Sequence, residues 1–148
     1  MDTSKIFNGP VALYTQAKKA IGEKIAPPEI HDVGCAFCVD TVFHRAFGSY
    51  IGKGGTPQQS TAQMLVELEA SASFTEISEP RQGCIVMYAT GTSSKGPDVH
   101  GHVLVMGDTW LMSNNSYTGV FEANYTLATA KAYFQDTKGF TPRYFLPL

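Results

Sequence analysis

Residues 34–48 of the chain read Gly-Cys-Ala-Phe-Cys-Val-Asp-Thr-Val-Phe-His-Arg-Ala-Phe-Gly. Apolar side chains recur in this stretch at intervals of three and four residues, which is the spacing of one buried face of an α-helix. We expect a helix that begins near Cys35 and ends at Gly48, because glycine suits the position after a last helical turn. The buried face of this helix is expected to consist of Val39, Val42, Phe43 and Ala46.

Helices are also predicted on either side of this central segment. Residues 11–25 carry apolar side chains at helical spacing with lysines between them, and Pro27 and Pro28 end that helix. Residues 60–63, Ser-Thr-Ala-Gln, resemble a capping box, which opens a third helix through residues 64–68. The first half of the chain is therefore expected to be helical.

The second half of the chain changes to short runs rich in β-branched and aromatic residues, separated by glycine and proline. These runs predict strands at 74–78, 84–90, 102–107, 109–113 and 142–147. Gly107-Asp108 suits a tight hairpin between the third and fourth strands, and Thr126 is placed to cap a short helix over 127–135. Helices followed by an antiparallel sheet make an α+β fold, expected as a single domain over residues 1–148.

The composition fits one globular domain. The 148 residues are 43% apolar and 16% charged, which is enough apolar material for a core and argues against disorder. A formal charge of −2 lacks the basic excess of proteins that bind nucleic acid or anionic membranes. We expect no membrane span and no secretory signal, because no apolar run is long enough for either. Three cysteines cannot all pair within one chain, which excludes a disulfide scaffold and favours synthesis in a reducing compartment.

Cys35 stands at the N-terminus of the predicted central helix. A thiol in that position lies at the positive end of the helix dipole and near free amides, which lower its pKa and favour the thiolate. The same amides can stabilise the oxyanion that forms when a thiolate attacks a carbonyl. The alternative interpretation is a small, unreactive core residue.

His102 opens a predicted strand and shares a strand face with Leu104 and Met106. Gly101 before it allows another segment to approach closely. An imidazole there would form a Cys–His nucleophile with Cys35 if the two side chains came within about 3 Å of each other. A structural histidine is the alternative interpretation.

Asn114 follows the next predicted strand and is the candidate for a third member of the site. If the 107–108 hairpin pairs the two strands, the Asn114 side chain can accept a hydrogen bond from the far ring nitrogen of His102. Ser113 is the alternative for this role, because a slip of one residue exchanges the two faces of a strand. Residues 113–116 are also typical of a simple turn.

Several of these segments together resemble a known superfamily. Gly34-Cys-Ala-Phe-Cys-Val39 resembles the C-A-x-x-V start of the catalytic helix in CHAP-type and NlpC-type cysteine amidases and peptidases. Gly101-His102-Val103 is similar to the G-H-V strand of that superfamily, and Gly83-Cys-Ile-Val86 resembles its first core strand. The matching segments follow in the same order along about the whole chain. Cys84 departs from the pattern, since the superfamily usually has Asp after this glycine.

The resemblance implies a papain-like fold and a cysteine hydrolase that cleaves amide bonds in bacterial peptidoglycan without a metal or cofactor. It implies Cys35 as nucleophile, His102 as general base and Asn114 as the orienting residue. It also implies a phage-type lytic or wall-penetrating enzyme, made in the bacterial cytoplasm and acting in the periplasm or cell wall after release or from a virion. Its partners would be peptidoglycan and a phage or secretion-system protein. Whether the enzyme is an endopeptidase or an N-acetylmuramoyl-L-alanine amidase stays open.

Two other classes of function stay open as well. A phage structural or adaptor protein can keep such a fold without activity. A Cys₂His₂ zinc site is the second alternative, although the spacing is not that of a zinc finger and no second Cys-x-x-Cys is present. Its four ligands would be Cys35, Cys38, His100 and His102.

The remaining histidines and one carboxylate near the helix start have no matching partners in the sequence. His31 and His44 are interpreted as surface or structural residues, and Asp32 as a loop carboxylate. Cys38 is interpreted as a buried residue one turn along the helix of Cys35.

Overall fold

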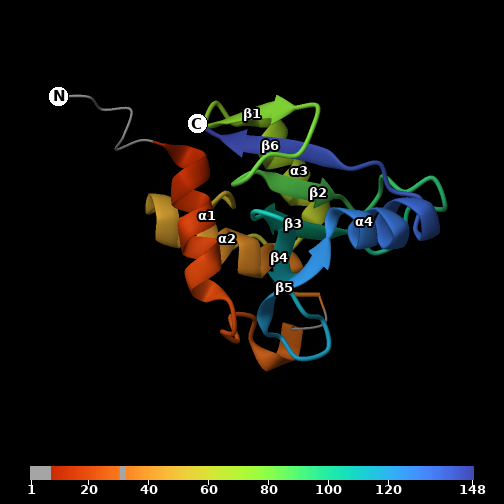
Figure 1. Cartoon of the computed structure of the whole chain (residues 1–148), viewed down its shortest axis with the longest axis horizontal. Coiled ribbons are helices and arrows are strands. Elements are labelled where there is room, and N and C mark those ends of the chain that lie inside the picture. Colours follow the sequence, from red (N-terminus) through yellow and green to blue (C-terminus); the bar gives the residue numbers. More distant parts are fainter. Residues whose placement is uncertain (1–7, 31–32) are drawn as a thin grey trace.

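The computed structural model of the chain describes residues 8–30 and 33–148 (Figure 1). These residues form an α+β fold in which four α-helices pack with one six-stranded antiparallel sheet. The helices are α1 (Gly9–Ala20), α2 (Cys35–Phe47), α3 (Thr61–Ala70) and α4 (Leu127–Ala130). The strands are β1 (Phe74–Ile77), β2 (Ile85–Tyr88), β3 (His102–Met106), β4 (Trp110–Asn114), β5 (Phe121–Thr126) and β6 (Arg143–Pro147). Their order across the sheet is β1-β6-β2-β3-β4-β5.

The central helix and the helix after it are confirmed. α2 begins and ends where the sequence predicts, and Gly48 follows it in a left-handed conformation (φ 79°) that other residues rarely adopt. The expected buried face is correct except for Ala46, which is only half-buried. Ser60 caps α3, because its Oγ accepts a hydrogen bond from the N–H of Gln63 at 3.2 Å.

The first helix ends earlier than predicted. Helical spacing continues over 11–25, but α1 ends at Ala20. Gly22 then turns the chain with a φ of 94°, and its N–H donates to the carbonyl of Phe121 at 2.8 Å. This hydrogen bond attaches the chain to an edge of the sheet, so a contact between distant residues outweighs the local pattern.

The sheet contains the expected strands and one that the sequence did not indicate. The predicted runs correspond to β1, β2, β3, β4 and β6, with ends shifted by a few residues. The hairpin between β3 and β4 is confirmed, since the N–H of Gly107 donates to the carbonyl of Trp110 at 2.8 Å. β5 reads Phe-Glu-Ala-Asn-Tyr-Thr, has no continuous apolar run, and is half-buried except at Phe121. Such a polar sequence is tolerated because β5 forms an edge of the sheet.

The segment after β5 is helical as expected but changes type. Thr126 caps α4 through a capping box with Thr129. The predicted helix over 127–135 continues as a π-helix, Lys131–Thr137, which we call the π-helical segment. Segments of this kind are frequent at functional sites.

Apolar side chains cover both faces of the sheet. α2 packs against β3 and β4 on one face, where Val103, Val105 and Met112 join the larger core. On the other face, Leu104 and Leu111 pack against residues of α4 and the π-helical segment. The starts of α2 and β3 and the end of β4 therefore meet at one side of the molecule (Figure 1). Among the described residues, no helix combines the length and apolar character needed to cross a membrane.

Candidate active site

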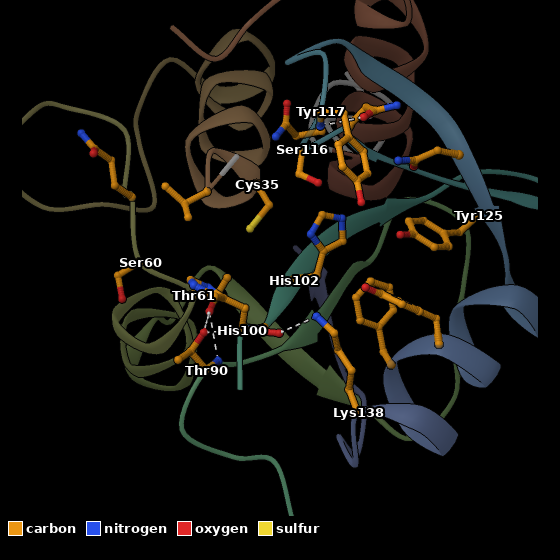
Figure 2. A pocket seen from close by; sticks show the side chains of 18 residues that line it. Cys35, Ser60, Thr61, Thr90, His100, His102, Ser116, Tyr117, Tyr125 and Lys138 are labelled. Carbon is orange, nitrogen blue, oxygen red and sulfur yellow. Dashed lines mark hydrogen bonds between the residues drawn. The ribbon is translucent and has the colours of Figure 1, made fainter. Parts of the chain in front are cut away.

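A cavity of about 540 Å³ opens where α2 and β3 begin and β4 ends (Figure 2). Its walls come from five segments of the chain. Two of them are the start of α2 and residues 59–61, which lead into α3. The others are the loop before β3, the β4–β5 connection, and the π-helical segment together with Lys138. Cys35, His102 and Asn114 all line it. Side chains that are distant in the sequence thus face one space.

Cys35 lies in the wall of this cavity as the first residue of α2. Figure 2 shows the side chains of Cys35 and His102 both reaching into the cavity. Gly34 permits this position, because a Cβ there would lie 2.7 Å from the Cβ of Ala26 and 3.0 Å from the carbonyl oxygen of Ile30. Gly101 likewise allows the chain to pass close to its neighbours before β3, because a Cβ there would lie 2.0 Å from the carbonyl oxygen of Tyr88. The close approach expected at Gly101 is confirmed.

The expected low pKa of Cys35 is wrong. Cys35 is only 9% exposed, and its burial raises the pKa of the thiol above its usual value. Backbone hydrogen bonds from Val103 and Ala36 and the charge of Lys138 act in the opposite direction without outweighing burial. The uncharged thiol is therefore the resting form of this side chain.

His102 is held by a hydrogen bond at its Nε2 atom. Nε2 lies 2.9 Å from the Oγ of Ser113, and that hydroxyl donates to the Oδ1 of Asn124 at 2.7 Å. Because the hydroxyl proton of Ser113 is directed to Asn124, its oxygen accepts from the N–H of Nε2. The lone pair of the ring is then on Nδ1, which is the nitrogen that a general base needs.

This arrangement corrects the expected contact of Asn114. In the β3–β4 register Val105 pairs with Met112, so Ser113 points to the face of the sheet that carries His102. Asn114 points to the opposite face, toward α2, and its Nδ2 lies 3.6 Å from where a Cβ of Gly34 would be. The alternative assignment to Ser113 is therefore the one that matches the geometry, while Asn114 stays in the cavity wall beside the start of α2.

Asn124 is a member of the site that the sequence analysis missed. β4 and β5 pair Leu111 with Tyr125 but Ser113 with Glu122, so β5 contains one extra residue between these pairs. A bulge of this kind redirects side chains, and here it accompanies the contact between Asn124 and Ser113. No local sequence signal marks such a bulge.

The surroundings of His102 keep its ring uncharged. The ring stacks on Phe134 with centroids 5.2 Å apart, and Tyr125 meets it edge-on at 6.0 Å. Burial lowers the pKa of His102 to about 4, and the positive charge of Lys138 acts in the same direction. The cavity at rest thus holds a neutral thiol and a neutral imidazole in its lining.

A buried carboxylate that the sequence analysis also missed holds one wall of the cavity. Asp40 of α2 is fully buried and accepts backbone N–H groups of Ile51 at 2.6 Å, Gly52 at 2.9 Å and Gln58 at 2.8 Å. Burial raises the pKa of Asp40, and these three bonds oppose the rise. Asp40 thereby fixes the loop that leads to Gln59 in the cavity wall.

The zinc alternative finds no support in the described part of the chain. Within residues 8–30 and 33–148, no three or more His, Cys, Asp or Glu side chains are grouped so that they could hold a metal ion. Cys38 is fully buried in the larger core one turn beyond Cys35, as expected. His44 stacks on Tyr50 with ring centroids 4.2 Å apart. His31 and Asp32 lie outside the described residues.

No family model matches the chain, and no curated protein matches it either.

Proposed function

We propose that the chain is a cysteine hydrolase with a papain-like fold that cleaves amide bonds in bacterial peptidoglycan. The observation that carries this proposal is the convergence of Cys35 and His102 on one cavity, with the Nε2 atom of His102 held by Ser113. A nucleophile, a base and a group that orients the base are the three parts that thiol catalysis requires. The resemblance of the Gly34–Val39 and Gly101–Val103 segments to CHAP-type and NlpC-type enzymes supports the same class.

The proposed reaction begins with attack of the Cys35 sulfur on the carbonyl carbon of the scissile amide. Because both side chains are neutral at rest, Nδ1 of His102 takes the thiol proton as the sulfur–carbon bond forms. The protonated ring then gives this proton to the nitrogen of the leaving amine, the carbon–nitrogen bond breaks, and a thioester remains on Cys35. Nδ1 of His102 next takes a proton from a water molecule as its oxygen attacks the thioester carbon. The carbon–sulfur bond then breaks, the carboxylate product leaves, and the thiolate takes the proton back from Nδ1.

In this proposal, backbone N–H groups at the start of α2 stabilise the oxyanion that forms during the attack. The first N–H groups of a helix have no partner within the helix, and those of Cys35 and Ala36 lie close enough to the sulfur to lower the pKa of the thiol. The same groups can donate to the oxygen that becomes negative when the sulfur attacks. In this proposal Ser113 replaces Asn114 as the orienting residue, and Asn124 holds Ser113.

The proposed substrate and setting follow from the sequence resemblance together with the cavity. A cavity of about 540 Å³ falls in the range of small-ligand sites and is large enough for a few residues of a peptide. We assign the chain to phage lysis or wall penetration, with action in the periplasm or cell wall. A non-catalytic adaptor is the alternative that the experiment below distinguishes.

The test is digestion of purified sacculi by the reduced protein, with mass spectrometry of the released muropeptides. New amine and carboxylate ends at one type of bond are expected for the unmodified protein and for Cys38→Ala, and none for Cys35→Ala. The identity of the new ends separates an endopeptidase from an amidase. Intact sacculi after treatment with the folded protein, together with no labelling of Cys35 by iodoacetamide, would contradict the proposal and favour the adaptor.

A further inference from the structure

The cavity carries one positive charge that the proposed reaction does not use. Lys138 follows the π-helical segment and lines the cavity together with Tyr133 and Phe134 (Figure 2). Its Nζ lies 5.0 Å from the ring centroid of Tyr133 and 6.0 Å from that of Phe134. Two aromatic faces therefore hold the ammonium group in place.

The ammonium group of Lys138 has N–H donors that can bind a ligand. Its Nζ donates to the carbonyl oxygen of His100 at 3.4 Å, which occupies one of three protons. The salt bridges found among the described residues are formed by Arg45, Lys131 and Arg143, not by Lys138. None of the described residues that line the cavity is Asp or Glu. Among the described residues that line the cavity, Lys138 is the only Lys, Arg, Asp or Glu, although the chain as a whole has a formal charge of −2.

Lys138 also shares its cavity with the proposed reacting groups. Cys35 and His102 line the same space, so a negative group bound to Nζ would lie in the cavity that holds the bond under attack. Such a group therefore belongs to the part of the substrate that surrounds the scissile amide. Stem peptides contain amides beside free carboxylates, which supply this chemistry.

We propose that Lys138 is a specificity residue that binds a free carboxylate of the substrate in the cavity that holds the scissile amide. The substrate class is thus an acidic peptide whose carboxylate is not amidated. This inference rests on the proposed function for the bond that is cut, but carboxylate binding at Lys138 can be measured without turnover.

The experiment uses pairs of synthetic stem peptides that differ only in one carboxylate, present as the free acid or as the carboxamide. For the free acid, the unmodified protein is expected to show a kcat/KM about tenfold to a hundredfold higher than for the amide, because a hydrogen bond between charged groups is lost in the amide. Lys138→Met should lower kcat/KM for the acid to the value for the amide. Lys138→Arg should keep the preference, and Lys131→Met, which changes an exposed lysine of the same segment, should leave it unchanged.

Binding of the same peptide pairs to Cys35→Ala, measured by calorimetry, separates this inference from the proposed function. A tighter Kd for the acid that is lost in Cys35→Ala/Lys138→Met supports carboxylate binding even if no peptide is hydrolysed. Equal kcat/KM and equal Kd for acid and amide, with Lys138→Met unchanged, would overturn the inference and leave the Cys–His proposal standing.

Discussion

Two pairs of residues in the site differ in how the sequence encodes them. The reacting pair, Cys35 and His102, consists of the ends of two elements, each preceded by a glycine that its neighbours require. The orienting pair, Ser113 and Asn124, depends on the β3–β4 register and on one extra residue in β5. The comparison shows that local sequence marks the proposed reacting groups, whereas strand pairing creates the contacts that orient them.

The largest effect is expected at Cys35, the nucleophile of the reacting pair. Cys35→Ala should lower peptidoglycan hydrolysis by about 10⁴-fold or more, because members of a catalytic unit fail together. Cys38→Ala is the matched control one helical turn away, and it should cost about 1 kcal/mol of stability while keeping activity. Rates of sacculus clearing and thermal melts measure both variants. An active Cys35→Ala beside an inactive but folded Cys38→Ala would contradict the assignment.

Loss of His102, the base of the reacting pair, is expected to lower activity almost as much. His102→Ala should lose nearly as much activity as Cys35→Ala, and the double variant should be no worse than either single one, since the two groups act as a unit. His44→Ala serves as control, because that ring stacks on Tyr50 and does not line the cavity. The measurement is kcat/KM on a soluble muropeptide. Losses that add in the double variant would mean that the two residues act separately.

An intermediate effect is expected at the orienting pair, Ser113 and Asn124. Ser113→Ala should lower kcat by about tenfold to a hundredfold, the size typical of a lost orienting partner, and Asn124→Ala should lose less because it acts through Ser113. Asn114→Ala is the informative comparison, since its side chain lies on the other face of the sheet. It should leave the acid limb of the pH profile in place, whereas Ser113→Ala should move it. A shift in Asn114→Ala alone would return the orienting role to Asn114.

The fold was predictable where local patterns decide the structure. The start of α2 at Cys35, its end before Gly48 and the cap at Thr126 depend on neighbouring residues and were correct. The length of α1 and the existence of β5 depend on contacts between distant residues. The local pattern therefore predicted too late an end for α1 and did not predict β5. An edge strand with a polar sequence is not distinguished from a loop by periodicity.

The candidate site was likewise predictable only where local sequence decides the position of a residue. Residue types and element starts indicated Cys35 and His102, but the choice between Ser113 and Asn114 required the register. The pKa of Cys35 could not be predicted, because the helix start favours the thiolate while burial opposes it, and sequence does not reveal burial. Asp40 was missed for a related reason, since its three N–H donors come from a loop beyond the end of its helix.

The smallest effect is expected in the dependence of activity on pH. Because burial lowers the pKa of His102 to about 4, the base stays deprotonated well below pH 6.5. The acid limb of kcat/KM should therefore lie near pH 4, as a property of the Cys35–His102 pair. Lys138→Met removes a positive charge that contributes to the low pKa of His102, so the limb should move to higher pH.

The stability of the protein has to be measured in the same experiment, because the lowered pKa of His102 also makes stability depend on pH. The unfolded chain protonates His102 near pH 6.5, while the folded chain keeps it neutral down to about 4, so stability falls as the pH decreases through this window. Thermal melts at each pH define where initial rates report on folded protein, and His102→Gln, which lacks the titrating ring, should lose less stability there. An acid limb near pH 6.5 in fully folded protein, or a limb that moves to lower pH in Lys138→Met, would contradict the neutral pair.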